Sequence, residues 1–179
     1  MKSLLALAHA IDWLTDRFGK IAAWAVILSC FISATNAVVR YGLDISSNAF
    51  LEVQWYLFAA CVMLGAAQVL RVNEHVRVDL IYARLSGHGK VYVDLFGLVV
   101  FLVPVMVTMI WFAWPLFTRM FLSGEMSNNA GGLIRWPAML TLPLGFGLVL
   151  LQGIGEIIKR VAWLMHAYEM DMHYERPLQ

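Results

Sequence analysis

Four long apolar stretches without a single Lys, Arg, Asp or Glu dominate this sequence, at about residues 21–39, 53–70, 95–118 and 137–155. The hydrocarbon core of a bilayer is roughly 30 Å thick and takes about 20 apolar residues of helix to cross, so each stretch can span it. Of the 179 residues, 61% are hydrophobic and 14% charged, which leaves little chain for a soluble domain. The sequence predicts an all-α membrane protein, a single membrane domain over residues 1–179 with four transmembrane helices, the third extending over about 91–118.

The segments before and after the spans are also expected to be helical. Within residues 1–19, apolar side chains recur at helical spacing, while Asp12 and Asp16 lie elsewhere around the axis. This pattern predicts an amphipathic helix in the membrane interface, although an inward continuation of the first span as an ordinary exposed helix fits the same residues. Residues 156–179 mix apolar and charged side chains and are expected to form a cytoplasmic helical extension of the fourth span and a tail.

A few residues inside the spans are expected to shape the helix bundle. Gln68 and Gln152 need hydrogen-bond partners in an apolar environment, which pairing with another helix supplies. Cys61 and Gly65 lie four residues apart and form a smooth face suited to helix contact. Pro104 in the third span lacks a backbone donor and is expected to interrupt the regular helix.

The distribution of basic residues predicts the topology. Most of the 13 Lys and Arg residues fall in three segments, the N-terminal segment, the connection after the second span and the C-terminal tail: Lys2, Arg17 and Lys20; Arg71, Arg77, Arg84 and Lys90; Lys159, Arg160 and Arg176. The positive-inside rule therefore places both termini in the cytoplasm, as expected for a multi-pass protein of a bacterial inner membrane. The net charge of +1 gives no reason to expect a nucleic-acid partner, whereas membrane lipids are expected ones.

The connection after the second span is dense in charge. It contains the candidate contact residues Arg71, Glu74, His75, Arg77 and Asp79. Such a segment suits either a solvated turn or a fixed ion-pair cluster that holds the connection against a partner, and the residues alone do not favour one over the other.

The outward connection between the third and fourth spans is the second informative segment. Its glycines permit tight turns, and Glu125 and Arg135 can pair across it. A simple connector and a loop that docks a periplasmic protein both fit this pattern. The candidates for docking or pairing on the outward side are Arg40, Glu52, Glu125, Arg135 and Trp136.

Motifs for catalysis and for cofactor or metal binding are missing from the sequence. It contains no phosphate-binding loop, no His-Glu-x-x-His and no Cys-x-x-Cys, so we expect no enzyme, cofactor or metal site. No Asp, Glu, Lys, Arg or His lies at a span centre, where an ion-coupled carrier usually holds its functional charge. All five histidines lie outside the spans, which argues against a haem-binding respiratory anchor.

Several segments together carry a family resemblance: Glu52-Val53-Gln54-Trp55-Tyr56, Gly65-Ala66-Ala67, Glu74-His75-Val76-Arg77-Val78-Asp79, Pro104, Gly124-Glu125-Met126-Ser127, Gly131-Gly132-Leu133 and Arg135-Trp136. With them, the chain resembles the small, DctQ-like membrane subunit of a tripartite ATP-independent periplasmic (TRAP) transporter. The segment from Gly124 onward resembles a subgroup associated with mannitol, chloroaromatic or 2-oxo acid names.

This resemblance implies a division of labour among three proteins. A periplasmic binding protein captures a carboxylate solute, a large membrane subunit moves it with a sodium gradient, and the small subunit braces the scaffold of the large one. The small subunit then needs no cofactor, because the sodium coupling belongs to its partner. Two alternatives from other classes are a four-helix respiratory anchor and a small self-assembling carrier.

Overall fold

The computed structural model describes residues 1–45, 47–73, 82 and 84–169, and these residues are almost entirely helical. The elements follow in the order α1 (Lys2–Leu43), α2 (Asn48–Arg71), α4 (Gly87–Phe96), the π-helix η1 (Gly97–Leu102), α5 (Val103–Ser123) and α6 (Trp136–Leu164). Four helical segments, Lys2–Leu43, Asn48–Arg71, Gly87–Ser123 and Trp136–Leu164, are long and apolar enough to cross a membrane, and each contains one of the expected spans. The all-helical fold with four potential membrane spans is thereby confirmed.

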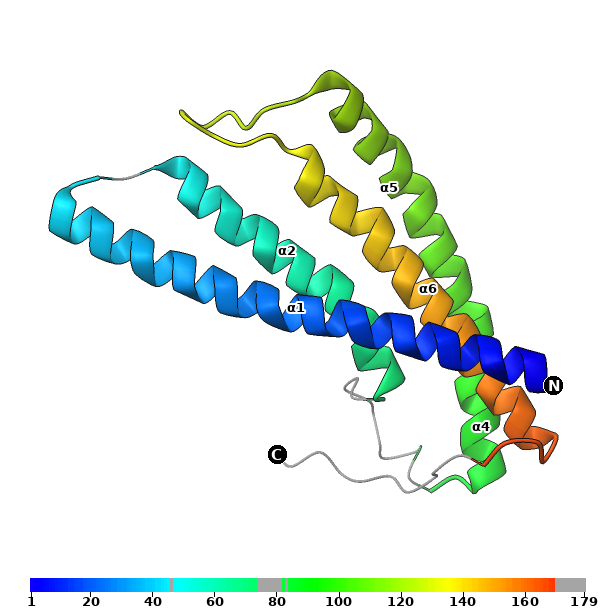
Figure 1. Ribbon diagram of the computed structural model, residues 1–179. Helices are drawn as coiled ribbons and strands as arrows, with labels where there is room; N and C mark the ends of the chain where they lie inside the picture. The colour runs from blue at the N-terminus through cyan, green and yellow to red at the C-terminus, as the bar shows by residue number, and fades with distance from the viewer. Residues whose placement is uncertain (46, 74–81, 83, 170–179) are drawn as a thin grey trace.

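Helix α6 lies at the centre of the arrangement. It packs against α1, α2 and α5, and Figure 1 shows it between α2 and α5. In the most apolar 18-residue stretch of each segment, 33% of α6 is buried, compared with 11% of α1, 11% of α2 and 6% of the α4–α5 segment. The small core where α1, α2 and α6 meet contains Ala22, Leu64, Ala67 and Leu148.

The first helix is longer than a membrane span requires. The segment 1–19 and the first span form one continuous helix of 42 residues, with no turn between them. Nothing near residue 20 breaks the helix, and the face containing Ala8, Ile11, Thr15 and Gly19 is buried. Gly19 lies against the Gln68 side chain of α2, whose Oε1 would lie 1.5 Å from a Cβ at this position.

The third span contains a local change of helix type. Because Pro104 has no N–H to donate to a carbonyl four residues earlier, the preceding residues widen into the π-helix η1. The N–H of Val103 donates to the carbonyl of Leu98, five residues back. The expected interruption at Pro104 thus takes the form of a wide turn inside a continuous helical segment.

The two ends of the bundle differ in what they contain. We call the end with residues 44, 45, 47 and 124–135 the loop end, where α2 and the α5–α6 loop meet. We call the opposite end, where the N-terminal half of α1 meets the ends of α2 and α6, the N-terminal end. The polar contacts between distant segments concentrate at these two ends.

Candidate functional site

One face of α2 holds the α5–α6 loop at the loop end. Asn48, Glu52 and Tyr56 are four residues apart, so their side chains project from the same side of the helix. Asn48 Nδ2 donates to the carbonyl of Ala130 at 3.0 Å, and the Tyr56 hydroxyl donates to the carbonyl of Ile134 at 3.2 Å. The loop is therefore attached to α2 at both its middle and its end.

Glu52 lies at the centre of this attachment. Only 3% of its surface is exposed, and each carboxylate oxygen accepts hydrogen bonds from the loop. Oε1 accepts from the Ser127 hydroxyl and from Asn129 Nδ2 at 2.7 Å, and Oε2 accepts from the N–H of Leu133 at 2.7 Å. Hydrogen bonds to a charged acceptor are stronger than neutral ones, so this single side chain is the main connection between α2 and the loop.

The loop also has its own backbone structure. Met126 and Ile134 form an isolated antiparallel bridge, and the N–H of Ser127 donates to the carbonyl of Leu133 at 2.9 Å. Gly131 has φ +70°, in the left-handed region that favours glycine, and a Cβ on Gly132 would lie 2.6 Å from the Ser127 Cβ. The two adjacent glycines are therefore required by the turn that brings Leu133 back beside Ser127.

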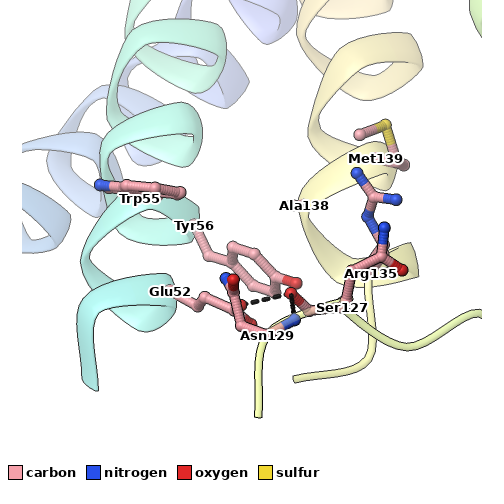
Figure 2. Close-up of a pocket in the computed structure, with 9 residues that line it drawn as sticks. Glu52, Trp55, Tyr56, Ser127, Asn129, Arg135, Ala138 and Met139 are labelled. Carbon is pink, nitrogen blue, oxygen red and sulfur yellow. Dashed lines mark hydrogen bonds between the residues drawn. The ribbon is translucent and has the colours of Figure 1, made fainter. Parts of the chain in front are cut away.

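A pocket of about 300 Å³ opens where the loop meets α2 and α6. Figure 2 shows Glu52 and Tyr56 projecting from α2 toward Ser127 and Asn129 of the loop, with Arg135, Ala138 and Met139 opposite. The lining residues are Glu52, Trp55, Tyr56, Ser127, Asn128, Asn129, Arg135, Ala138 and Met139. The Glu52 oxygens at this pocket already accept hydrogen bonds from the loop.

The structure brings together only some of the residues predicted to dock or pair on the outward side. Arg135 Nη1 lies 2.7 Å from Glu125 Oε1, so these two form an ion pair across the loop, beside Glu52. Trp136 begins α6, and its ring packs edge-to-face on Phe121 with centroids 5.4 Å apart. Arg40 is exposed in the last turn of α1 and takes part in none of the ion pairs found in the described part of the chain.

Of the five candidate residues in the charged connection, the structure describes only Arg71. Arg71 Nη2 lies 2.7 Å from Asp16 Oδ1, which ties the end of α2 to α1. Glu74, His75, Arg77 and Asp79 lie outside the described residues. The choice between a solvated turn and an ion-pair cluster there stays open.

The N-terminal end contains a mostly buried chain of ion pairs that the sequence did not predict. Lys159 Nζ contacts Asp12 Oδ1 of α1 at 3.1 Å and also Glu156 Oε1 of its own helix. Glu156 Oε2 accepts from Arg160 Nη1, and Arg160 Nη2 lies 3.0 Å from Asp94 Oδ2 of α4. The chain Asp12, Lys159, Glu156, Arg160 and Asp94 thus links three helices through α6.

Gln152 extends this chain toward the middle of the bundle. It is completely buried, its Oε1 accepts from the Thr15 hydroxyl at 2.8 Å, and its Nε2 donates to Asp12 Oδ1 at 2.9 Å and Glu156 Oε1 at 3.0 Å. The expectation that Gln152 pairs with another helix is confirmed. We call Gln152 and the five charged residues the buried polar chain.

One sequence signal could have revealed the buried polar chain. Gln152, Glu156 and Lys159 follow each other at spacings of four and three residues, so they share a face of α6 with the small residues that pack inside the bundle. Charges that continue the packing face of a span are expected to be buried with it. No group of three or more His, Cys, Asp or Glu suited to a metal ion occurs among the described residues.

Comparison with known proteins found one family match. The family described as "Tripartite ATP-independent periplasmic transporters, DctQ component" matches residues 29–162, which is most of the chain. A search of curated proteins found no match. The matched segment includes Glu52, the α5–α6 loop and the α6 part of the buried polar chain, whereas Asp12 and Thr15 precede it.

Proposed function

Because this chain belongs to the DctQ family of TRAP transporter components, we propose that it is a non-catalytic small subunit that braces the scaffold of the large membrane subunit. The complex is a sodium-coupled importer of organic acids, with the solute and the sodium ions bound in the large subunit. The small subunit lies in a bacterial inner membrane with both termini in the cytoplasm. The substrate subgroup suggested by the Gly124-Glu125-Met126-Ser127 segment stays a prediction.

The location of the charges carries this proposal. The four spans have no Lys, Arg, Asp or Glu in their central parts, and the ionisable side chains that are buried lie at the two ends of the helices. At the N-terminal end these charges are paired with each other, and at the loop end Glu52 is held by three donors. A carrier needs a polar site for its solute near the bilayer midplane, so a supporting role fits this chain better.

The exposed apolar surface supports a brace that packs against other hydrophobic molecules. Large side chains such as Trp111, Phe112 and Leu122 of α5 are mostly exposed, and so are Phe31 and Val38 of α1. Helices that expose this much apolar surface are stable where lipid or other membrane helices cover that surface. α5 packs mainly on α6 and leaves its other sides available for the large subunit.

The loop end supports a second part of the proposal, contact with the periplasmic binding protein. The α5–α6 loop is held by three side chains of one helix face, and Trp55 and Asn128 beside the pocket are exposed. A loop already held in one conformation loses little entropy when a partner docks on it. We therefore place the docking surface for the binding protein at this loop and pocket.

The test is co-expression with the large membrane subunit, followed by affinity purification and uptake measurements in liposomes. We expect the two subunits to purify together and to take up a carboxylate solute only with an inward sodium gradient and the binding protein. Liposomes with either membrane subunit alone are the controls and should show no uptake. Solute flux through this chain alone, or full uptake by the large subunit alone, would refute the bracing role.

A further inference from the structure

The N-terminal half of α1 separates its charges by sign. Its two acidic residues turn toward the bundle, where Asp12 pairs with Lys159 of α6 and Asp16 pairs with Arg71 of α2. Arg17 and Lys20, in contrast, are exposed. The structure thus leaves a basic outer surface on a segment whose acidic and basic residues are intermixed in the sequence.

Two tryptophans share this basic surface. Trp13, Arg17, Lys20 and Trp24 follow one another at spacings of four, three and four residues, so they form one line along α1. The Trp13 and Trp24 side chains are 59% and 63% exposed, and the Arg17 guanidinium lies 5.0 Å from the centre of the Trp13 ring. We call these four residues the basic–aromatic stripe.

The length of α1 places the stripe near a membrane surface. A helix of 42 residues is about 60 Å long, roughly twice the thickness of the hydrocarbon core. Part of α1 must therefore lie in the headgroup region or be strongly tilted. Trp side chains favour the headgroup level, and Arg and Lys extend their charged ends toward it.

From these observations we propose that the basic–aromatic stripe is a binding site for anionic phospholipid headgroups, in the leaflet at the N-terminal end of the bundle. Arg17 and Lys20 contact the phosphates, and the indole rings of Trp13 and Trp24 lie at the boundary between headgroups and acyl chains. The inward pairing of Asp12 and Asp16 matters because unpaired carboxylates on this surface would repel the same lipids.

A lipid fits this surface better than another membrane helix does. Helices in membranes approach each other through small residues, as α1 does where Ala22 and Gly19 meet α2. The stripe instead presents two indole rings and two long cationic side chains, which hold a neighbouring backbone at a distance. The inference rests on the membrane placement in the proposed function and needs neither the large subunit nor the binding protein.

The test measures thermal unfolding of the purified full-length chain in detergent micelles with increasing amounts of phosphatidylglycerol or phosphatidylcholine. A ligand that binds only the folded chain raises its midpoint temperature, so the lipid concentration needed for a given rise reports affinity. We expect Arg17→Gln/Lys20→Gln to need about thirtyfold more phosphatidylglycerol, because each cation near an anionic surface contributes a several-fold gain in affinity. The matched control, Arg40→Gln/Arg119→Gln, removes two exposed cations elsewhere on the chain and should keep the wild-type response.

The outcomes separate this inference from the proposed function. Equal midpoints of variant and wild type in phosphatidylcholine show that the variant folds, and an equal rise with phosphatidylglycerol in both would refute the lipid site. The lipid site is also refuted if phosphatidylcholine raises the midpoint temperature of the wild type by as much as phosphatidylglycerol does. If the variant instead responds normally to lipid but no longer purifies with the large subunit, the stripe contacts that protein. Failure of the lipid test with intact uptake by the complex refutes only the lipid site.

Discussion

At the scale of single residues, Glu52 is the clearest case of a side chain whose role depends on the fold. The sequence makes it a candidate docking or pairing residue on the outward side, and in the structure it is buried with three donors from a loop 75 to 81 positions later in the chain. A buried carboxylate is stable only where its oxygens are hydrogen-bonded, and the loop supplies those bonds. The same carboxylate therefore orders the loop that surrounds it.

The first prediction tests this ordering with Glu52→Gln. The new amide keeps the size of the side chain, but its NH₂ group faces a donor where a carboxylate oxygen accepted a hydrogen bond. We expect amide hydrogen exchange at Leu133 to become about tenfold faster, because the loop opens more often. We also expect uptake by the complex to require more binding protein, since the docking loop is less ordered.

Glu125→Gln is the matched control for this variant, because it makes the same chemical change in the same loop. The Glu125–Arg135 pair is partly exposed, with side-chain exposures of 41% and 38%, and exposed ion pairs contribute little. Exchange at Leu133 should stay close to the wild-type rate. Equal acceleration in both variants would show that the loop responds to any loss of charge.

At the scale of elements, α6 is the helix on which the others assemble. Its glycines allow neighbours to come close, and at Gly145 a Cβ would lie 2.7 Å from both the Cβ and the backbone carbonyl oxygen of Met63 in α2. Backbone atoms cannot move aside as the end of a flexible side chain can. The spacing between α2 and α6 therefore depends on the absence of a side chain at Gly145.

The second prediction compares Gly145→Ala with Gly147→Ala in the same helix. Gly145→Ala forces α2 and α6 apart, and overpacking of this kind typically lowers the free energy of unfolding by about 1–3 kcal/mol. A Cβ on Gly147 meets nothing within 4 Å, so this control variant should be unchanged or slightly more stable because Ala favours helix. Thermal unfolding in detergent micelles measures the stability of both variants. Equal midpoint temperatures for Gly145→Ala and Gly147→Ala would refute the close contact between α2 and α6.

At the scale of the whole molecule, the helices form an open arrangement whose two ends are held by different chemistry. The loop end is held by hydrogen bonds between three side chains of α2 and the α5–α6 loop, and the N-terminal end depends on the buried polar chain and the Asp16–Arg71 pair. Between these ends, contacts are made by small and apolar side chains. An arrangement with fixed ends and apolar outer surfaces suits a subunit that adds rigidity to a larger membrane complex.

The third prediction tests the orientation of the two ends in the membrane. In a chain with Cys30 and Cys61 replaced by Ala, Asn128→Cys adds a thiol at the loop end and Arg84→Cys adds one in the connection before α4. With both termini in the cytoplasm, a membrane-impermeant maleimide labels Asn128→Cys in intact cells, and labels Arg84→Cys only after the membrane is opened. The reverse pattern would invert the proposed topology.

The sequence alone determined the helical class, the four potential spans and the family, because each of these depends on residues close together in the chain. Twenty apolar residues without a charge form a span in lipid whatever the rest of the protein does, and the family motifs are local segments. The composition of residues 1–19 fits both a helix in the membrane interface and an inward continuation of the first span, and α1 runs through both segments since nothing in between disrupts its backbone.

Only the tertiary structure decided which charged residues are buried and what they contact. Asp12 and Lys159 are 147 positions apart, and Asp94 and Arg160 are 66 apart, so no local pattern pairs them. Their pairing follows from the crossing of α1 and α4 with α6, where a charge without a partner is costly in the low-dielectric interior. The packing of α1 against α6 and α2 turns Asp12 and Asp16 inward and leaves Arg17 and Lys20 exposed, which gives α1 a basic surface that the sequence does not reveal.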